Sequence, residues 1–211
     1  MLTVHHLGIS QSDRVVWLCE ELGLSYELRR YERDPVTRLA PAEYKALHPS
    51  GTAPVIHDGD LVLAESAAII EYIVTKYGGG RLAVAPSASN YPDYLYWFHA
   101  GPGSFMPAMM VDLVLSIAGV SGDVAAALKA RGDNAFRMLE ERLSQVPYLA
   151  GDEFTAADII NLFPLTTGRM FVPRDLAPFP SIRAYLQRIG ERTAFRTAMQ
   201  KADPDLPLML A

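Results

Sequence analysis

The sequence predicts a chain of two parts, an α/β domain in the order βαβαββα followed by a domain made only of helices. Three observations lead to this prediction. The first eighty residues alternate short β-rich runs with stretches of helical periodicity. Almost everything after Tyr91 has helical periodicity without a clear strand. Half of the 211 residues are apolar, so each part can bury a core.

The first predicted unit is a strand, a helix and a second strand. Leu2 to Leu7 is a short β-rich run. Asp13 to Leu22 repeats apolar residues on one helical face, and Gly23 suits the C-cap. Tyr26 to Tyr31 is the next expected strand. Because a helix joins the two strands, we expect them to be parallel.

The rest of the first domain is expected to be a short helix, a hairpin and a longer helix. A proline suits the start of the short helix, and an Asp-Gly turn separates the hairpin strands. Three consecutive glycines end the longer helix. The predicted ranges are 41–48 for the short helix, 55–56 and 61–63 for the strands, and 66–77 for the longer helix.

The second domain follows a linker that contains Pro86, Ser87, Ser89 and Asn90. We expect domain 1 over residues 1–80, the linker over 81–90 and domain 2 over 91–211. Thr155 and Asp158 form the pattern of a capping box at a helix start. The predicted helices are 91–118, 123–145, 156–171, 181–192 and a short one near Phe195.

Charge and cysteine content exclude several classes of function. The net charge of −5 and the pI of about 5.5 argue against nucleic acid or an anionic membrane as a partner. Cys19 is the single cysteine, which excludes an internal disulfide and a CxxC redox pair and fits the cytoplasm. Residues 94–111 are uncharged, but their glycines and prolines favour a buried, kinked helix over a membrane span.

Five motifs together resemble the cytosolic glutathione transferase family, and the resemblance covers nearly the whole chain. The family has a thioredoxin-like amino-terminal domain and an all-helical carboxy-terminal domain. RDPVTRLAP and YWFHAGPGSFMP resemble a bacterial and fungal subgroup. The five motifs are SQSDRVVWLCEELGLSYE (10–27), HPSGTAPVI (48–56), LAESAAIIEYI (63–73), YLAGDEFTAAD (148–158) and FPSIRAYLQRI (179–189).

The resemblance implies a glutathione site in the first domain, without a metal. Pro54 corresponds to a cis proline, and Ala53 before it is implied to pair through its backbone with the cysteinyl part of glutathione. Glu65 and Ser66 map onto the pair that holds the γ-glutamyl end, where free N–H groups of a helix start suit a carboxylate. Taken alone, Ser66 could equally be an N-cap and Glu65 a first-turn acid. Weaker implied contacts are Lys45 and His48, for the glycyl carboxylate, and Thr52.

Thiol activation has three candidate sources. Ser10 follows the first strand, where serine-type classes of the family carry their catalytic hydroxyl, and no tyrosine stands at the position used by tyrosine-type classes. Ser12 is the competing hydroxyl, and backbone N–H groups are the third source. Ser10 could instead be a structural cap, because residues 10–13 spell S-x-x-D. His5 and His6 are neighbours in a strand, so at most one of them can reach the site.

The resemblance also implies an apolar electrophile pocket and a homodimer. The subgroup usually has an acidic residue at the position of Pro102, so this chain departs from the pattern there. The leading hypothesis is a detoxifying transferase that conjugates glutathione to electrophiles or reduces peroxides with it. The alternatives are a glutathione-dependent disulfide reductase and a non-enzymatic member that binds ligands or another protein. The expected pocket residues are Phe98, Phe105, Met106, Met109 and Met110.

Overall fold

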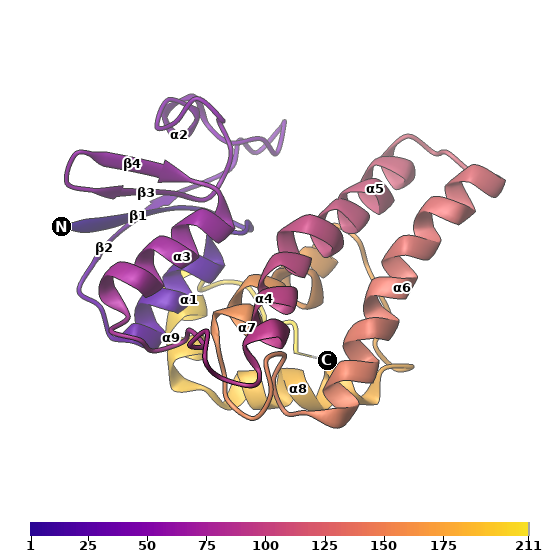
Figure 1. The fold of residues 1–211 in the computed structure, drawn as a ribbon. Helices are drawn as coiled ribbons and strands as arrows, with labels where there is room; N and C mark the ends of the chain where they lie inside the picture. Colours follow the sequence, from indigo (N-terminus) through magenta and orange to yellow (C-terminus); the bar gives the residue numbers. More distant parts are fainter. Residues whose placement is uncertain (211) are drawn as a thin grey trace. The chain divides into compact units, whose positions relative to one another are not determined.

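The structure is a computed structural model that describes residues 1–210, and it divides into two compact units. Unit 1 comprises Met1–Leu82 together with Glu191–Leu208. Unit 2 comprises Ala83–Gly190 together with Met209 and Leu210. Figure 1 shows the β/α and the helical parts. The fold class matches the prediction, but the predicted ranges assign everything after residue 91 to the helical domain, whereas Glu191–Leu208 pack with unit 1.

Unit 1 contains a mixed four-stranded sheet in the order β2-β1-β3-β4. β1 and β2 are parallel, as predicted for strands joined by a helix, and β3 is antiparallel to both β1 and β4. The predicted hairpin is therefore confirmed as β3 and β4. The strands are β1 (Leu2–Leu7), β2 (Glu27–Tyr31), β3 (Val55–Asp58) and β4 (Leu61–Ala64).

The helices of unit 1 cover the two faces of this sheet. In Figure 1, α1, α3 and α9 lie below the strands and α2 lies above them. Apolar side chains of α1 and α3, such as Trp17 and Ile70, are fully buried, which follows from their helical spacing. Gly23 ends α1 in the left-handed conformation, as expected for a C-cap. These helices are α1 (Asp13–Leu22), α2 (Ala42–Lys45), α3 (Ser66–Tyr77) and α9 (Thr193–Ala202).

The packing of α9 on α1 explains why the last part of the chain belongs to unit 1. The ring of Phe195 meets the ring of Trp17 edge to face, with centroids 5.1 Å apart. Just before α9, the guanidinium of Arg192 donates two hydrogen bonds of 2.7 Å to the carboxylate of Glu21. Both contacts join residues more than 170 positions apart, and local sequence patterns do not report such contacts.

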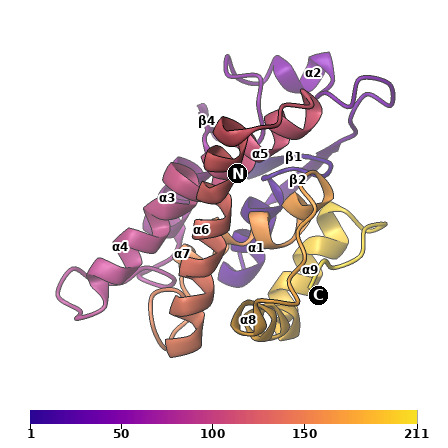
Figure 2. The same ribbon diagram turned by 90° about the vertical axis from the view of Figure 1, so that its right-hand side faces the viewer.

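Unit 2 is built from helices, which Figure 2 shows with α8 viewed nearly along its axis. The long helix α6 has the predicted bounds, and the capping box of Thr155 and Asp158 at the start of α7 is confirmed. The predicted helix over 156–171 ends early, because Pro164 cannot donate a helical hydrogen bond and two short 3₁₀ turns follow. The α-helices are α4 (Tyr91–Ala100), α5 (Met106–Ile117), α6 (Asp123–Gln145), α7 (Ala156–Asn161) and α8 (Pro180–Glu191).

A π-helical turn over Gly101–Phe105 separates α4 from α5. Pro102 and Pro107 lack the N–H groups that a regular helix needs, which explains the irregular turn. Gly101 approaches α7 so closely that a Cβ atom there would lie 3.0 Å from Oδ1 of Asn161. The interruption therefore lies where two helices of unit 2 come together.

The stretch Tyr91–Ile117 is long and apolar enough to cross a membrane by length and composition, because an 18-residue window within it has a mean hydropathy of 1.3. Length and composition alone are weak grounds for a membrane span, because core helices of soluble domains meet the same criteria. In this structure α4 packs against α7 and α5 packs against α6. We therefore describe the stretch as part of the helical unit.

Candidate active site

Strand register brings three segments of unit 1 to one edge of the sheet. Val55 pairs with His5 on one side and with Ala64 on the other. Because both pairings are antiparallel, the loop after β1, the residues before β3 and the residues after β4 emerge at the same end. Each of these three segments carries one of the predicted site residues: Ser10 follows β1, Ala53 precedes β3 and Ser66 follows β4.

The segment before β3 presents unpaired backbone groups. The peptide bond between Ala53 and Pro54 is cis, as the resemblance implied. The hydrogen bonds of the described residues leave both the N–H and the carbonyl of Ala53 without a partner. Ala53 is half-buried, so its unpaired donor and acceptor are available to a ligand.

The segment after β4 combines an exposed carboxylate with a helix start. Glu65 adopts a left-handed φ of 74°, which is uncommon for a residue with a side chain. Its side chain is exposed, and no side chain caps the start of α3 in the described part of the chain. The first N–H groups of α3 are therefore available to an anion.

A polar link joins this helix start to the loop after β1. The hydroxyl of Ser66, which is 8% exposed, donates a long hydrogen bond of 3.5 Å to Oε1 of Gln11. The same oxygen accepts a hydrogen bond of 2.9 Å from the guanidinium of Arg14. Burial lowers the pKa of Arg14 to about 10, while the nearby carboxylate of Asp13 acts in the opposite direction.

Gln11 and Arg14 were not among the predicted site residues. Gln11 lies in the turn just before α1 and Arg14 in the first turn of that helix, and this short separation in the sequence is a signal that sequence reasoning could have used. Their connection to Ser66, 55 residues away from Gln11, becomes visible only in the folded chain.

Ser10 and Ser12 lie close together and face inward. The hydroxyl oxygens are 2.7 Å apart, and the hydroxyl of Ser10 also lies 2.6 Å from the carbonyl oxygen of Leu7. Ser12 is fully buried, whereas Ser10 is 6% exposed. The N–H of Ser12 donates to the hydroxyl of Ser10 over 3.3 Å, which resembles the local capping role considered for Ser10.

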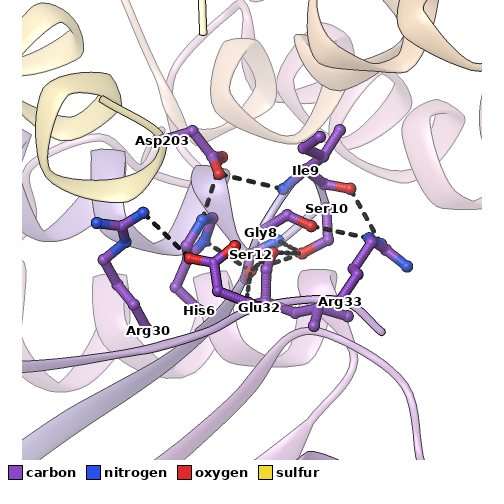
Figure 3. A network of polar contacts seen from close by, with 10 residues as sticks. His6, Gly8, Ile9, Ser10, Ser12, Arg30, Glu32, Arg33 and Asp203 are labelled. Carbon is purple, nitrogen blue, oxygen red and sulfur yellow. Dashed lines mark hydrogen bonds and ion pairs between the residues drawn. The ribbon is translucent and has the colours of Figure 1, made fainter. Parts of the chain in front are cut away.

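The two serines are the end of a longer chain of polar groups, shown in Figure 3. The hydroxyl of Ser12 is 2.9 Å from Nδ1 of His6, and Nε2 of His6 is 3.1 Å from Oδ2 of Asp203. His6 is completely buried. Asp203 follows α9, so residues almost 200 positions apart meet here. The sequence did not indicate Asp203. For His6 it predicted only that at most one of His5 and His6 can reach the site.

The backbone between Leu7 and Ser10 is held by charged side chains. Ile9 has a left-handed φ of 53°, which is an outlier for a β-branched residue. Its N–H donates to Oδ1 of Asp203 over 3.2 Å, and its carbonyl accepts from Arg33 over 3.0 Å. Arg33 also donates to the carbonyl of Gly8 over 2.8 Å (Figure 3). Such contacts stabilise a conformation that isolated chains rarely adopt.

The other predicted polar residues lie at the end of α2 and in the loop between α2 and β3. Lys45 and Thr52 are exposed. His48 accepts a hydrogen bond of 3.1 Å at Nδ1 from the N–H of Ser50. Because Nδ1 is an acceptor in that bond, the neutral ring carries its proton on Nε2, where it can serve as a donor.

The predicted pocket residues all belong to unit 2. Phe98 and Phe105 are buried, Met106 and Met109 are half-buried, and Met110 is 51% exposed. Phe105 also lines a cavity of about 570 Å³ within unit 2, beside the facing residues of α5 and α6. The polar site residues belong to unit 1, so the two sets lie on different units.

The remaining titratable candidates have structural surroundings. His5 contacts His57 and Tyr31 on the opposite side of β1 from His6, as strand alternation requires. Burial, with the charge of His57, lowers the pKa of His5 to about 4. Burial raises the pKa of the Cys19 thiol to about 12, which makes it a poor nucleophile at neutral pH. Residues 1–210 contain no group of three or more His, Cys, Asp or Glu side chains that could hold a metal ion.

Profiles of two protein families match the chain. The family described as "Glutathione S-transferase, N-terminal domain" matches residues 10–76. The family described as "Glutathione S-transferase, C-terminal domain" matches residues 105–193. The two matches cover both parts of the fold.

Known proteins are similar to the chain over nearly its full length. Glutathione S-transferase 3 of Schizosaccharomyces pombe is 30% identical over 96% of this chain and 88% of its own. A crystal structure of a glutathione S-transferase from Actinobacillus pleuropneumoniae is 36% identical, with a TM-score of 0.89 over 100% of this chain and 99% of that one. A sphingomonad glutathione S-transferase complexed with glutathione shares the fold, with 24% identity and a TM-score of 0.76 over 95% of this chain and 98% of that one.

Proposed function

Because the chain belongs to the glutathione S-transferase family, we propose that it binds glutathione at the sheet edge of unit 1 and conjugates it, through its thiolate sulfur, to small apolar electrophiles. The observation that carries this proposal is the set of unpaired groups at that edge. Ala53 offers a free backbone donor and acceptor, and Glu65 and the start of α3 offer a carboxylate and free N–H groups. This set complements a peptide with a charged γ-glutamyl end.

Each end of glutathione has a partner of suitable chemistry in this proposal. The ammonium group pairs with Glu65, and the neighbouring carboxylate accepts from Ser66 and the first N–H groups of α3. The cysteinyl backbone pairs with Ala53. Lys45 and the Nε2 donor of His48 are available to the glycyl carboxylate, and the exposed Thr52 lies beside them. A sphingomonad glutathione S-transferase with the same fold is complexed with glutathione, which supports glutathione as the ligand.

Conjugation requires the thiolate form of glutathione. A free thiol has a pKa of about 8.5, so only a few per cent is ionised at neutral pH. Lowering that pKa by about two units requires about 2.7 kcal/mol of preferential stabilisation of the anion. Among the three candidate sources, we assign the hydroxyl of Ser10. Ser10 is the more exposed of the two serines and lies just ahead of the start of α1.

The electrophile is proposed to contact apolar side chains of unit 2. Methionine side chains are flexible and polarizable, and they accommodate ligands of different shapes. Met110 is exposed and Met106 is half-buried, so both can contribute such surface. The buried Phe98 and Phe105 support the surface from within the helical unit.

The experiment combines binding with a substrate screen. Calorimetric titration with glutathione comes first, followed by turnover assays with a halogenated arene, an organic peroxide and a mixed disulfide of glutathione. Conjugation of the arene supports the proposal, and additional turnover of the peroxide adds peroxidase activity to it. Turnover of the disulfide alone would instead identify a glutathione-dependent reductase. Binding without any turnover would identify a non-enzymatic member, and absence of binding would reject the site.

A further inference from the structure

We propose that Ser12, His6 and Asp203 form a proton relay behind Ser10, which carries the thiol proton of bound glutathione to Nδ1 of His6. The inference rests on the proposed function, because it requires the thiol to meet the hydroxyl of Ser10. It adds a destination for the proton and assigns roles to His6 and Asp203. Neither side chain touches the substrate, so both act through the serines.

The relay is continuous and lies within unit 1. The oxygens of Ser10 and Ser12 are 2.7 Å apart, Ser12 is 2.9 Å from Nδ1 of His6, and Nε2 of His6 is 3.1 Å from Asp203 (Figure 3). All three distances are within hydrogen-bond range. Ser12 and His6 are fully buried, so solvent does not compete for these contacts.

Asp203 sets the direction of the hydrogen bonds. An ionised carboxylate only accepts, so a neutral His6 places its single ring proton on Nε2 and leaves Nδ1 as an acceptor. The hydroxyl of Ser12 must then donate to Nδ1. It also accepts from the N–H of Leu7 over 3.1 Å. The bond between the two serines can therefore exist only with Ser10 as the donor.

This arrangement points every hydrogen from Ser10 toward His6. Ser10 already accepts from the N–H of Ser12, and its remaining lone pair can accept the proton of a thiol, while its own hydrogen moves to Ser12 and that of Ser12 moves to Nδ1. The S–H bond breaks, an N–H bond forms on His6, and no electrons leave the system. After the transfer the hydrogen bonds between Ser10, Ser12 and Nδ1 of His6 run in the opposite direction, so Ser10 donates to the thiolate, while Nε2 of His6 still donates to Asp203. The carbonyl oxygen of Leu7 lies 2.6 Å from the hydroxyl oxygen of Ser10, so it competes for the single hydrogen of Ser10 with Ser12 before the transfer and with the thiolate after it.

The charges around Asp203 favour the final state. Burial by itself would raise the pKa of Asp203, but the hydrogen bonds from His6 and from the N–H of Ile9 outweigh it and hold the pKa below its ordinary value. Asp203 therefore stays ionised and stabilises an imidazolium on His6, as the buried aspartate does in a Ser-His-Asp triad. The charged side chains facing this region come from β2 and its following loop and from the segment after α9: Arg30, Glu32, Arg33, Arg38 and Asp205.

Counting protons tests the relay in the unaltered protein. Glutathione and S-methylglutathione are titrated at about pH 7 by calorimetry in two buffers of different ionisation enthalpy, and the thiolate is followed by its ultraviolet absorbance. The S-methyl compound has no thiol, so the difference between the ligands isolates the thiol proton. The relay predicts a thiolate signal with almost no extra proton released. Release of about one proton per thiolate would overturn the relay, because Ser10 or the backbone would then act without a proton acceptor.

Asp203→Asn tests the role of the carboxylate, with Asp205→Asn as the matched control. An amide cannot accept from both His6 and Ile9, so the variant should lose most of the thiolate signal and on the order of 100-fold in turnover. Its affinity for S-methylglutathione should change less than about twofold, since the peptide contacts lie elsewhere. Asp205 is exposed and outside the relay, so its variant should match the parent. An unchanged thiolate signal in Asp203→Asn would reject the relay.

The outcomes separate failure of the relay from failure of the proposed function. If neither ligand binds, the glutathione site itself is rejected. If both bind but no thiolate forms, the assignment of Ser10 and the relay fail together, while the binding site stands. If Asp203→Asn does not fold, as judged by thermal melting, the proton count in the unaltered protein decides the question alone.

Discussion

Glu65 holds a strained backbone conformation at the candidate site. A left-handed φ on a residue with a side chain costs on the order of 1–3 kcal/mol, and such residues concentrate at functional sites. This strain arises from the backbone conformation, and any residue with a Cβ atom at this position would have it. Replacing Glu65 by alanine therefore removes the carboxylate without changing the strain, which allows ligand binding and folding to be tested separately.

Glu65→Ala and Ser66→Ala are each expected to weaken glutathione binding by about 1–3 kcal/mol, because each removes a charged or charge-assisted partner of the γ-glutamyl end. Calorimetric titration measures the affinity, and thermal melting measures stability. Glu71→Ala is the matched control, since Glu71 is exposed on the same helix. Unchanged affinity in both site variants would remove glutathione from this edge of the sheet.

Ser10→Ala is expected to raise the pKa of the bound thiol by about one unit or more, which corresponds to about 1.4 kcal/mol. Its glutathione affinity at low pH should stay nearly unchanged, because the peptide contacts are intact. Absorbance of the thiolate against pH gives the pKa. A donor role for Ser10 without the relay predicts a much smaller effect for Ser12→Ala, whereas the relay predicts comparable effects. A shift in Ser12→Ala alone would transfer the assignment to Ser12, and no shift in either would favour backbone donors.

At the scale of residues, local motifs predicted those candidates whose positions follow from a strand end, a turn or a helix start. Ser10, Ala53 and Ser66 are of this kind, because register alone brings their segments together. Asp203 could not be predicted in the same way. Its contacts with His6 and Ile9 depend on α9 packing against α1, and the residues around Asp203 carry no local motif for that contact.

At the scale of elements, one carboxylate ties the hairpin to α3. Oδ2 of Asp58, at the end of β3, accepts from Tyr72, Lys76 and Tyr77 of that helix. These hydrogen bonds, the one from Lys76 first, hold the pKa of Asp58 well below its usual range. Three donors on one oxygen favour the ionised form strongly. These hydrogen bonds therefore hold the β3–β4 hairpin, which flanks the candidate site, against α3, the helix that begins at Ser66.

Asp58→Asn is expected to lower the stability of the folded protein at neutral pH, because the amide loses the ionic contact with Lys76. A depressed pKa contributes stability that is present above the ordinary carboxyl pKa of about 3.9 and lost as pH falls toward the folded value. The difference between parent and variant should thus shrink below about pH 4. Chemical denaturation at several pH values measures it. Asp60→Asn, exposed in the same turn, should show little difference at any pH.

Elements with complete start and stop signals were predicted most accurately. α1 ends at Gly23 and α6 spans Asp123–Gln145, both as expected. The predicted helix after Thr155 was too long, because apolar periodicity continued through Pro164 although its backbone cannot continue a helix. The π-helical turn was predicted only as a kink, since proline and glycine indicate irregularity without specifying its form.

At the scale of the molecule, α5 bears an apolar stripe that its own unit does not cover. Met110, Val114 and Ile117 are 51%, 55% and 78% exposed, and their spacing places them on one helical face. Contiguous exposed apolar surface of this kind commonly marks a protein interface. The stripe supports the proposed homodimer, in which a two-fold axis would present the same surfaces on both subunits.

Val114→Glu is expected to shift a dimer toward monomers, because a buried unpaired carboxylate is costly at an interface. The side chain is exposed in a single chain, so the substitution should leave the fold of the monomer intact. Sedimentation at micromolar concentration measures the assembly. Val36→Glu is the control, because Val36 is 88% exposed on unit 1 and lies in a loop. A parent protein that sediments as a monomer would reject the homodimer.

Glu191–Leu208 pack with unit 1 although they follow unit 2 in the sequence, and from this we expect a particular order of folding on the ribosome. Chains emerge at roughly 5–20 residues per second, and domains usually fold from the amino terminus onward. Unit 1 cannot be completed until α9 and Asp203 have been synthesised. Ala83–Gly190 are synthesised before them, so the helical unit can fold before unit 1 is complete. We expect the nascent β/α part to remain incomplete, and accessible to chaperones, until Glu191–Leu208 emerge. The relay to His6 would then be among the last contacts to form.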